Sequence, residues 1–318
     1  MSLTKIFNTK KIYFLNDSLA FFLKDIFKID LYHYYSEKLT KHCNNCGEKK
    51  KKVFYTRSKP DFDINILPKK ISKKFYIRFL GKCLNCNLLQ DYLRLNLNEN
   101  LHFINKLKYK EKSSTTLHNI LSAPNYLSEY FKDNLKKRIK KWKNNIDLKK
   151  NSKILILRPE NNLIINFLEK KFNPKLIDYI DYSNLGINYI KKYSKKASLK
   201  EGNIHGEFSG KIFNKSDCYD LIIVNHLMVH STNLNRCFYL LKKIIKPKGQ
   251  IIFINEIQIK YHNPFHINLW DENQFKKILM KHFIKVKIIR DCGYTKYSVS
   301  PFTLKNDNPD FLVSKKSC

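Results

Sequence analysis

The sequence has 318 residues and a formal net charge of +34, because 61 lysines and arginines outnumber 27 aspartates and glutamates. Hydrophobic residues make up 43% and aromatic residues 14%, which exceeds what disordered chains carry and indicates a sizeable buried core. Glycine and proline number only 8 and 9, which excludes collagen-like and low-complexity classes.

The positive charge has two interpretations. A strongly basic chain can bind nucleic acid, because lysine and arginine neutralise phosphates and release counterions. Only seven of the 61 basic residues are arginine, which leaves 54 lysines distributed over almost every window. Nucleic-acid recognition makes particular use of the arginine fork, which is scarce here. We therefore favour a lysine-rich composition on solvated faces, and keep RNA or another polyanion as the less favoured partner.

Residues 1–42 form an amino-terminal extension for which the sequence gives no function. Its most apolar stretch, Ile12 to Phe27, is interrupted by charged and polar residues and falls short of the roughly 20 apolar residues that cross a bilayer. We expect no membrane partner and a cytoplasmic protein. In such a reducing compartment, paired cysteine spacings favour metal binding over disulfides.

Residues 43–95 contain two CxxC units and are predicted to form a zinc-binding domain. Two residues between cysteines let both sulfurs face one ion from a tight turn, and four thiolates complete a closed, structural tetrahedral site. Gly47 supplies the positive φ that such turns often need. Strand-like composition at Lys52 to Arg57 and at Phe75 to Leu80 is typical of a zinc ribbon. The predicted Zn²⁺ ligands are Cys43, Cys46, Cys83 and Cys86.

Residues 96–150 are polar and lysine-rich and are predicted to form a helical linker. Apolar residues from Tyr126 to Trp142 follow a helical period and make one stripe. We expect this stripe to pack against the following domain and the lysines between 136 and 143 to face solvent, with an RNA or acidic-surface contact as the alternative.

Residues 151–318 alternate short β-branched runs with helical periods, which predicts an α/β domain with a mostly parallel sheet covered on both faces. Any ligand is then expected at the carboxyl ends of the strands. Asp271 with Gln274 predicts a capped helix start. The expected strands are Lys153 to Leu157, Leu176 to Asp181, Leu221 to Val224, Gln250 to Ile254 and Lys285 to Ile289, and the expected helices are Leu163 to Phe172, Leu234 to Ile245 and Phe275 to His282.

Several segments in this order resemble class I S-adenosylmethionine-dependent methyltransferases with an amino-terminal zinc-binding domain, a group that includes sugar C-methyltransferases. CLNCNLLQ at residues 83–90 is similar to the family's CxxCGLVQ, with Asn87 in place of glycine. DLIIVNHLMVH at 220–230 resembles its fourth-strand motif, KPKG at 246–249 its turn into the fifth strand, and HINLW at 266–270 the segment that follows. The resemblance implies a Rossmann-like methyltransferase domain with S-adenosylmethionine as cofactor.

The resemblance also implies roles for single residues. Asp181 matches the acid that accepts hydrogen bonds from the ribose hydroxyls, and a turn residue at the end of the strand is the alternative. His226 and His230 lie where family members place residues that face the transferred methyl group, and either could act as a general base. Both histidines also suit hydrogen bonding at a helix surface or in the core. His266 and Glu207 are further candidates, for the same cleft and for the adenine amino group respectively.

The family's glycine-rich cofactor loop is replaced here by LRPENN at residues 157–162. Arg158 and Glu160 take glycine positions, and an ordinary residue forced into a left-handed conformation costs roughly 1–2 kcal/mol. We therefore expect a changed loop shape, in which Arg158, Glu160 and Asn161 contact the cofactor, fill its place through an Arg158–Glu160 ion pair, or face solvent. A second departure is that many relatives continue into a further carboxyl-terminal domain, whereas this sequence ends at Cys318.

Three functions follow as hypotheses. The first is methyl transfer from S-adenosylmethionine to a small-molecule substrate, with a nucleotide-linked sugar as one candidate. The second is a catalytically inactive binding or scaffold protein on the same fold, prompted by the missing glycines. The third is an RNA-modifying or RNA-binding protein, prompted by the lysine excess and the zinc ribbon.

Overall fold

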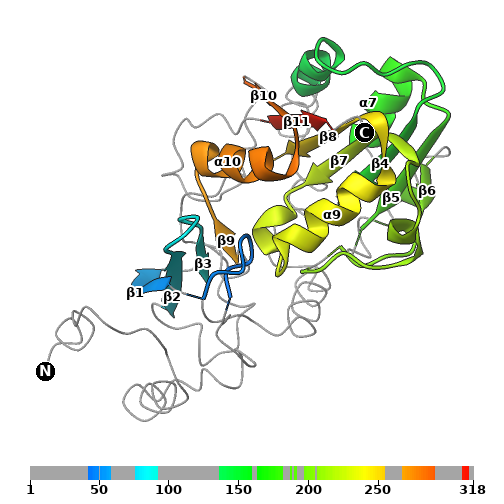
Figure 1. Ribbon diagram of the computed structural model, residues 1–318. Helices are drawn as coiled ribbons and strands as arrows, with labels where there is room; N and C mark the ends of the chain where they lie inside the picture. The colour runs from blue at the N-terminus through cyan, green and yellow to red at the C-terminus, as the bar shows by residue number, and fades with distance from the viewer. Residues whose placement is uncertain are drawn as a thin grey trace, which may run out of the picture.

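The computed structural model describes residues 42–49, 51–58, 76–91, 136–159, 163–181, 187, 190–191, 197–204, 206–254, 267–290 and 310–314. These residues form a large and a small β-sheet, with helices around the large one (Figure 1). None of the helices within these ranges is both long and apolar enough to cross a membrane.

The large sheet has seven strands in the order β10-β11-β8-β7-β4-β5-β6. The neighbours from β8 to β6 pair in parallel, and β11 runs antiparallel to both β8 and β10. This topology confirms the predicted mostly parallel, Rossmann-like sheet. The strands are β4 (Lys153–Leu157), β5 (Leu176–Ile180), β6 (Ala197–Leu199), β7 (Tyr219–Asn225), β8 (Ile245–Ile254), β10 (Lys285–Ile289) and β11 (Asp310–Ser314).

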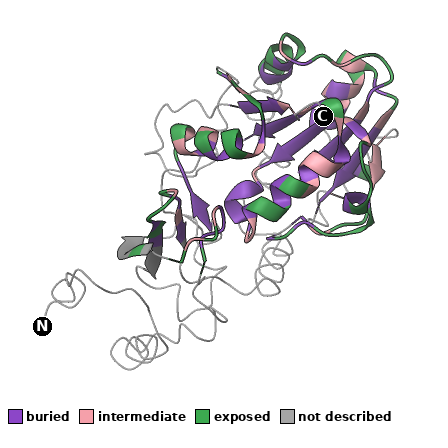
Figure 2. Cartoon of the chain, in the orientation of Figure 1, coloured by how far each residue is buried: buried purple, intermediate pink, exposed green. Residues whose placement is uncertain are grey.

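Helices cover both faces of this sheet, because successive strand residues point to opposite faces and both sets are apolar. α7 (Leu163–Phe172) and a helix over residues 136–143 pack on one face. α9 (Leu234–Ile244) and α10 (Glu272–His282) pack on the other, together with the short 3₁₀ helix η2 (Lys211–Asn214). The sheet is buried throughout its centre, whereas the outward sides of the helices are exposed (Figure 2).

The capped helix start predicted at Asp271 is present. The predicted apolar stripe that begins at Tyr126 is described only from residue 136, where Ile139 and Trp142 are buried, and its earlier part lies outside the described residues. α10 has the expected capping box: Asp271 accepts from the Gln274 backbone N–H at 2.8 Å, and the Gln274 side chain accepts from Asp271 N–H at 3.2 Å. In the helix over 136–143, Trp142 is buried while the lysines are exposed. Arg138 differs from the lysines around it, since it is buried and pairs with Asp310 of β11 at 3.1 Å.

The small sheet has the order β1-β2-β3-β9 and is antiparallel throughout. β1 (Lys51–Ser58) and β2 (Tyr76–Cys83) contain the two predicted ribbon strands, and β3 (Leu89–Asp91) follows the second CxxC unit. The fourth strand, β9 (Asn268–Leu269), comes from the α/β half of the chain. The small sheet therefore joins segments about 180 residues apart in sequence, Leu89 facing Leu269 and Gln90 facing Asn268.

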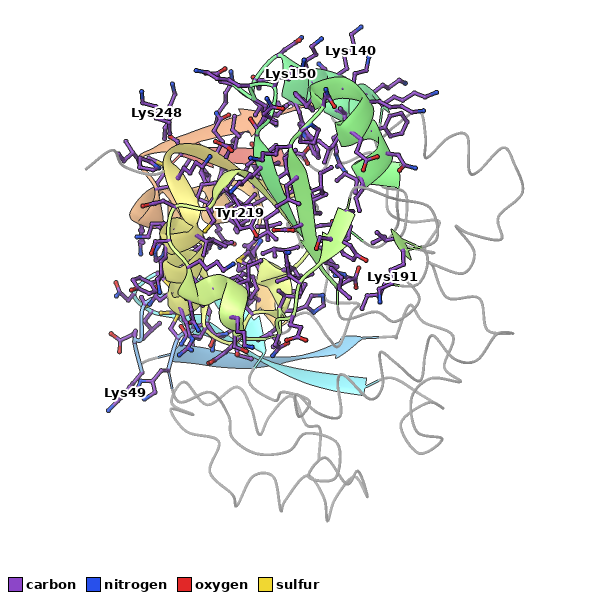
Figure 3. All side chains as sticks on the ribbon, turned by 90° about the vertical axis from the view of Figure 1, so that its right-hand side faces the viewer. Lys49, Lys140, Lys150, Lys191, Tyr219 and Lys248 are labelled. Atoms are coloured by element: carbon purple, nitrogen blue, oxygen red, sulfur yellow. The ribbon has the colours of Figure 1, made fainter. Side chains whose placement is uncertain are left out.

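Lysine side chains lie at the surface around both the large and the small sheet. Lys49, Lys140, Lys150 and Lys248 point outward in Figure 3 from four separate places on the molecule. Tyr219 lies in the interior, and its hydroxyl donates to Asp178 at 2.7 Å. Burial, reinforced by that carboxylate, raises the pKa of Tyr219. The spread of the lysines fits the interpretation of the charge as solvated composition.

Candidate functional site

The structure brings the four predicted zinc ligands together. The sulfurs of Cys43, Cys46, Cys83 and Cys86 all lie within 4.8 Å of one another. The Cys43–Cys86 and Cys46–Cys83 sulfur pairs are each 3.5 Å apart. A tetrahedral ion with Zn–S bonds of about 2.3 Å separates its sulfurs by about 3.8 Å, so the arrangement fits a four-thiolate zinc site.

Each CxxC unit folds into the same backbone turn. Cys43 N–H donates to Glu48 O at 2.9 Å and Gly47 N–H to Cys43 O at 2.9 Å. The second unit has the same two bonds. Cys83 N–H donates to Leu88 O at 2.9 Å, and Asn87 N–H donates to Cys83 O at 3.0 Å. Gly47 has φ 74° and Asn87 has φ 59°, so Asn87 adopts the left-handed conformation that glycine holds in the first turn.

The thiols influence one another's acidity. The hydrogen bond from Cys43 lowers the pKa of Cys86 to about 4, against the opposing effect of its burial. The same contact and then burial raise the pKa of Cys43.

A second candidate site lies at the carboxyl edge of the large sheet. The chain passes from β4 to β5 and β6 on one side and then returns to β7 on the other, so β4 marks the topological switch point. Open α/β sheets bind ligands beside this point, outside the carboxyl ends of the strands. The residues that directly follow β4, β5 and β7 there are Arg158, Asp181 and His226.

Arg158 and His226 are both left-handed, with φ 62° and 52°. Arg158 Nη1 donates to His226 O at 2.9 Å, and Nδ2 of Asn225, the residue before His226, donates to Arg158 O at 2.9 Å. Their N–H groups donate to Ile180 O at 2.8 Å and Ile254 O at 3.0 Å. These bonds hold two strained residues at the ends of neighbouring strands, a feature that clusters at functional sites.

Arg158, which was predicted to take a glycine position, thus adopts a left-handed backbone of the kind that glycine favours. The remainder of the predicted loop, with Glu160 and Asn161, lies outside the described residues, as does His266. Asp181 is 6% exposed and directly follows Ile180, whose carbonyl accepts from Arg158 N–H. The structure therefore places Asp181 beside Arg158 at the switch point.

The two histidines lie together after β7. His230 is buried in the 3₁₀ helix η3 (Met228–His230), and the His226 and His230 rings meet edge to face with centroids 5.3 Å apart. Glu207 is exposed. The carbonyl of the preceding residue, Gly206, accepts from Thr232 N–H at 2.9 Å, which places Glu207 near the end of η3. Asn225, which was not predicted from the sequence, fixes the Arg158 carbonyl; its position as the last residue of an apolar strand is the signal that could have identified it.

No family model matches the chain, and no curated protein matches its sequence. Among solved structures it is similar to a chain of the complex between the Haloferax volcanii Trm112 methyltransferase activator and a methyltransferase, at 10% identity and a TM-score of 0.46, covering 58% of this chain and 92% of that one. Geranyl diphosphate C-methyltransferase from Streptomyces coelicolor has 7% identity and a TM-score of 0.45, with 64% and 86% covered. The N-methyltransferase NodS from Bradyrhizobium japonicum has 15% identity and a TM-score of 0.44, with 59% and 97% covered.

Proposed function

We propose that this chain transfers a methyl group from S-adenosylmethionine to a small metabolite, with a nucleotide-linked sugar as the first candidate acceptor. The observation that carries the proposal is the buried Asp181 carboxylate at the carboxyl end of β5, next to the switch strand β4. A carboxylate accepts two hydrogen bonds from vicinal ribose hydroxyls, so its position suits the nucleoside part of this cofactor. The resemblance of residues 220–230 to a methyltransferase motif supports the same assignment.

Each residue at this edge has a separate proposed role. Asp181 holds the ribose hydroxyls, and the Arg158 guanidinium, placed by its bond to His226 O, contacts the carboxylate of the cofactor. His226 or His230 takes the proton that the acceptor releases as its nucleophilic atom bonds to carbon. When bound, S-adenosylmethionine supplies the electrophilic methyl group on a sulfonium.

Calorimetric titration with S-adenosylhomocysteine tests the cofactor site. Wild type is expected to bind, and Asp181→Ala is expected to weaken binding at least about tenfold, because two hydrogen bonds to a charged group are lost. Asp147→Ala is the matched control, an exposed aspartate before β4 at the opposite edge of the sheet, and should leave affinity unchanged. Absence of binding by wild type at millimolar ligand would overturn the proposal.

The histidines are tested by transfer of labelled methyl groups to a pool of small metabolites. The variant that removes the general base, His226→Gln or His230→Gln, should lower kcat by about 10²- to 10⁴-fold. Equal, small effects of both substitutions would show that neither histidine takes the proton.

We further propose that Cys43, Cys46, Cys83 and Cys86 hold one structural Zn²⁺. The four-thiolate set leaves no open position for substrate, so this ion supports the fold and takes no part in the reaction. Elemental analysis should give one zinc per chain, which Cys83→Ser removes and Cys218→Ser, outside the cluster and partly exposed, retains. Equal zinc content in the two variants would contradict the site.

A scaffold without catalysis is the second candidate, and one observation favours it. Arg158 occupies a position where the related enzymes have glycine, and its side chain crosses from the end of β4 to the end of β7. If this side chain excludes the cofactor, Arg158→Gly will create binding of S-adenosylhomocysteine that wild type lacks. Binding by wild type that Arg158→Gly weakens would reject the scaffold.

A further inference from the structure

The two CxxC turns face different surroundings. In the first turn, Asn44 and Asn45 are 8% and 4% exposed, because this turn is inserted against the α/β part. In the second turn, the equivalent residues are exposed, Leu84 to 53%. The first turn, residues 43–46, is therefore the one whose two middle residues are buried against the rest of the molecule.

Asn44 uses its backbone and its side chain in this contact. Its carbonyl accepts from the N–H of Leu234, the first residue of α9, at 3.2 Å. Its side-chain Nδ2 donates to Asn268 Oδ1 at 3.0 Å and, at 3.4 Å, to Ser231 O. Its backbone N–H donates to Gln90 Oε1 at 3.0 Å. One residue between two zinc ligands thus contacts β3, β9 and the start of α9.

Asn268 extends the connection to η3. Its Nδ2 donates to Met228 O at 2.9 Å and to Ser231 O at 2.7 Å, the carbonyls that flank Val229 and His230. The neighbouring Ile267 N–H donates to Val229 O at 2.8 Å. Asn268 is fully buried, so water does not compete for these bonds. Buried amide networks hold their members in one arrangement, because each group that loses its partner costs about 1–3 kcal/mol.

We propose that the first zinc turn positions His230, with Asn44 and Asn268 as positioning residues between the metal site and the carboxyl end of β7. The path runs from Cys43 and Cys46 through the Asn44 amide to Asn268, and from Asn268 to both ends of η3. The zinc-binding part then does more than support the chain, since removing the metal or the amide alters the edge of the large sheet. A role of this connection in catalysis rests on the proposed function, whereas the hydrogen-bonded connection itself is independent of it.

Hydrogen exchange tests the connection without cofactor or substrate. In Asn44→Ala, a peptide over residues 228–236 should exchange about five- to tenfold faster than in wild type, because the side-chain amide bonds of Asn44 to Ser231 O and to Asn268 are lost. A peptide over β4 should be unchanged. Asn85→Ala is the matched control, an exposed asparagine in the second turn, and should have no effect. Equal exchange of residues 228–236 in Asn44→Ala and Asn85→Ala would overturn the proposal.

A second measurement uses wild type and so does not depend on whether the variant folds. The imidazole resonances of His230, identified through His230→Gln, should shift when zinc is removed by a chelator and return when zinc is restored. The resonances of His282 on α10 should stay in place. Unchanged His230 resonances in a metal-free protein that stays folded would contradict the connection.

The results of these two experiments can be distinguished from a failure of the proposed function. Loss of S-adenosylhomocysteine binding with the exchange result intact would reject the methyltransferase and keep the connection. If both hold, methyl transfer should slow in Asn44→Ala and not in Asn85→Ala, because the proposed proton acceptor His230 loses its position.

Discussion

At the scale of single residues, the informative positions are non-glycine residues in the left-handed conformation. Asn87, Arg158 and His226 have φ of 59°, 62° and 52°. Asparagine tolerates this region better than other side chains, which explains how the second zinc turn keeps its shape without glycine. Arginine has no such preference, so hydrogen bonds across the sheet edge, to His226 O and from Asn225 Nδ2, hold Arg158 in this conformation.

Substitutions at Asn87 should follow this conformational preference. Asn87→Gly is expected to stabilise the protein by up to about 1 kcal/mol and Asn87→Ala to destabilise it by about 1 kcal/mol, because alanine resists positive φ. The free energy of unfolding in urea, with zinc present, measures both effects. The same two substitutions at exposed Asn85 serve as controls. Equal effects of glycine and alanine at Asn87 would show that the turn adapts to its residue.

At the scale of elements, the sequence predicts those strands and helices that a local pattern of residues determines. The five predicted strands are all present. Four of them are runs of β-branched or apolar residues that are largely buried, whereas β10 alternates exposed lysines with partly buried apolar residues. β6 was not predicted, since Ala197–Leu199 is a short, half-buried edge strand with little apolar signal. β11 was not predicted either, because Asp310–Ser314 inserts between β8 and β10 far from its sequence neighbours. β9 has two residues and is defined by its partner β3 alone.

The candidate sites likewise combine features that local sequence predicts with features that depend on the tertiary fold. Cysteine spacing was sufficient to predict the metal cluster, and the strand-end position of Asp181 follows from the pattern of β5. The link from Asn44 to Asn268 joins residues separated by 224 positions, and nothing in either local sequence distinguishes these asparagines from the many others. The Arg158–His226 bond likewise depends on β4 and β7 being neighbours, which topology decides.

The contact between α9 and α10 should make stability depend on pH. His282 near the end of α10 stacks on Phe238 of α9, with ring centroids 4.6 Å apart. Burial, with Lys242 and Lys281 nearby, lowers the pKa of His282 from 6.5 to about 4. Between these values the unfolded chain binds a proton that the folded chain does not, so stability is complete above about pH 6.5 and decreases as pH falls towards 4.

Replacing this side chain should flatten that dependence. His282→Phe is expected to lose less stability than wild type between pH 7.5 and 5, by on the order of 1–2 kcal/mol. Urea unfolding of both proteins at each pH measures this difference in stability. Contributions that both proteins share, including acid release of zinc, cancel when the two are subtracted. Parallel pH profiles would show that His282 titrates alike in the folded and unfolded chains.

At the scale of the whole molecule, most charged side chains of the described residues are at least partly exposed, but Arg138 and Asp310 form a buried pair that joins distant segments. Arg138 and Asp310 have side chains 6% and 0% exposed, and Asp310 also accepts from Trp142 Nε1 at 2.8 Å. This contact fixes the helix over 136–143 to β11, the antiparallel strand that pairs with both β8 and β10. The polar contact thereby connects the start of the α/β half with its last described strand.

Breaking this pair should cost far more than breaking an exposed one. Asp310→Ala leaves the Arg138 cation buried without its carboxylate, so the free energy of unfolding should fall by about 3–5 kcal/mol. The matched control is Glu272→Ala, which removes the exposed ion pair with Arg290 and should cost no more than about 1 kcal/mol. Adding Arg138→Met to Asp310→Ala should recover part of the loss, because the unpaired charge is removed and an apolar side chain fills its volume. Urea unfolding of the four proteins measures these differences. If Asp310→Ala and Glu272→Ala cost the same, the Arg138–Asp310 contact does not connect the two segments energetically, and apolar packing of Trp142 alone holds the helix to the sheet.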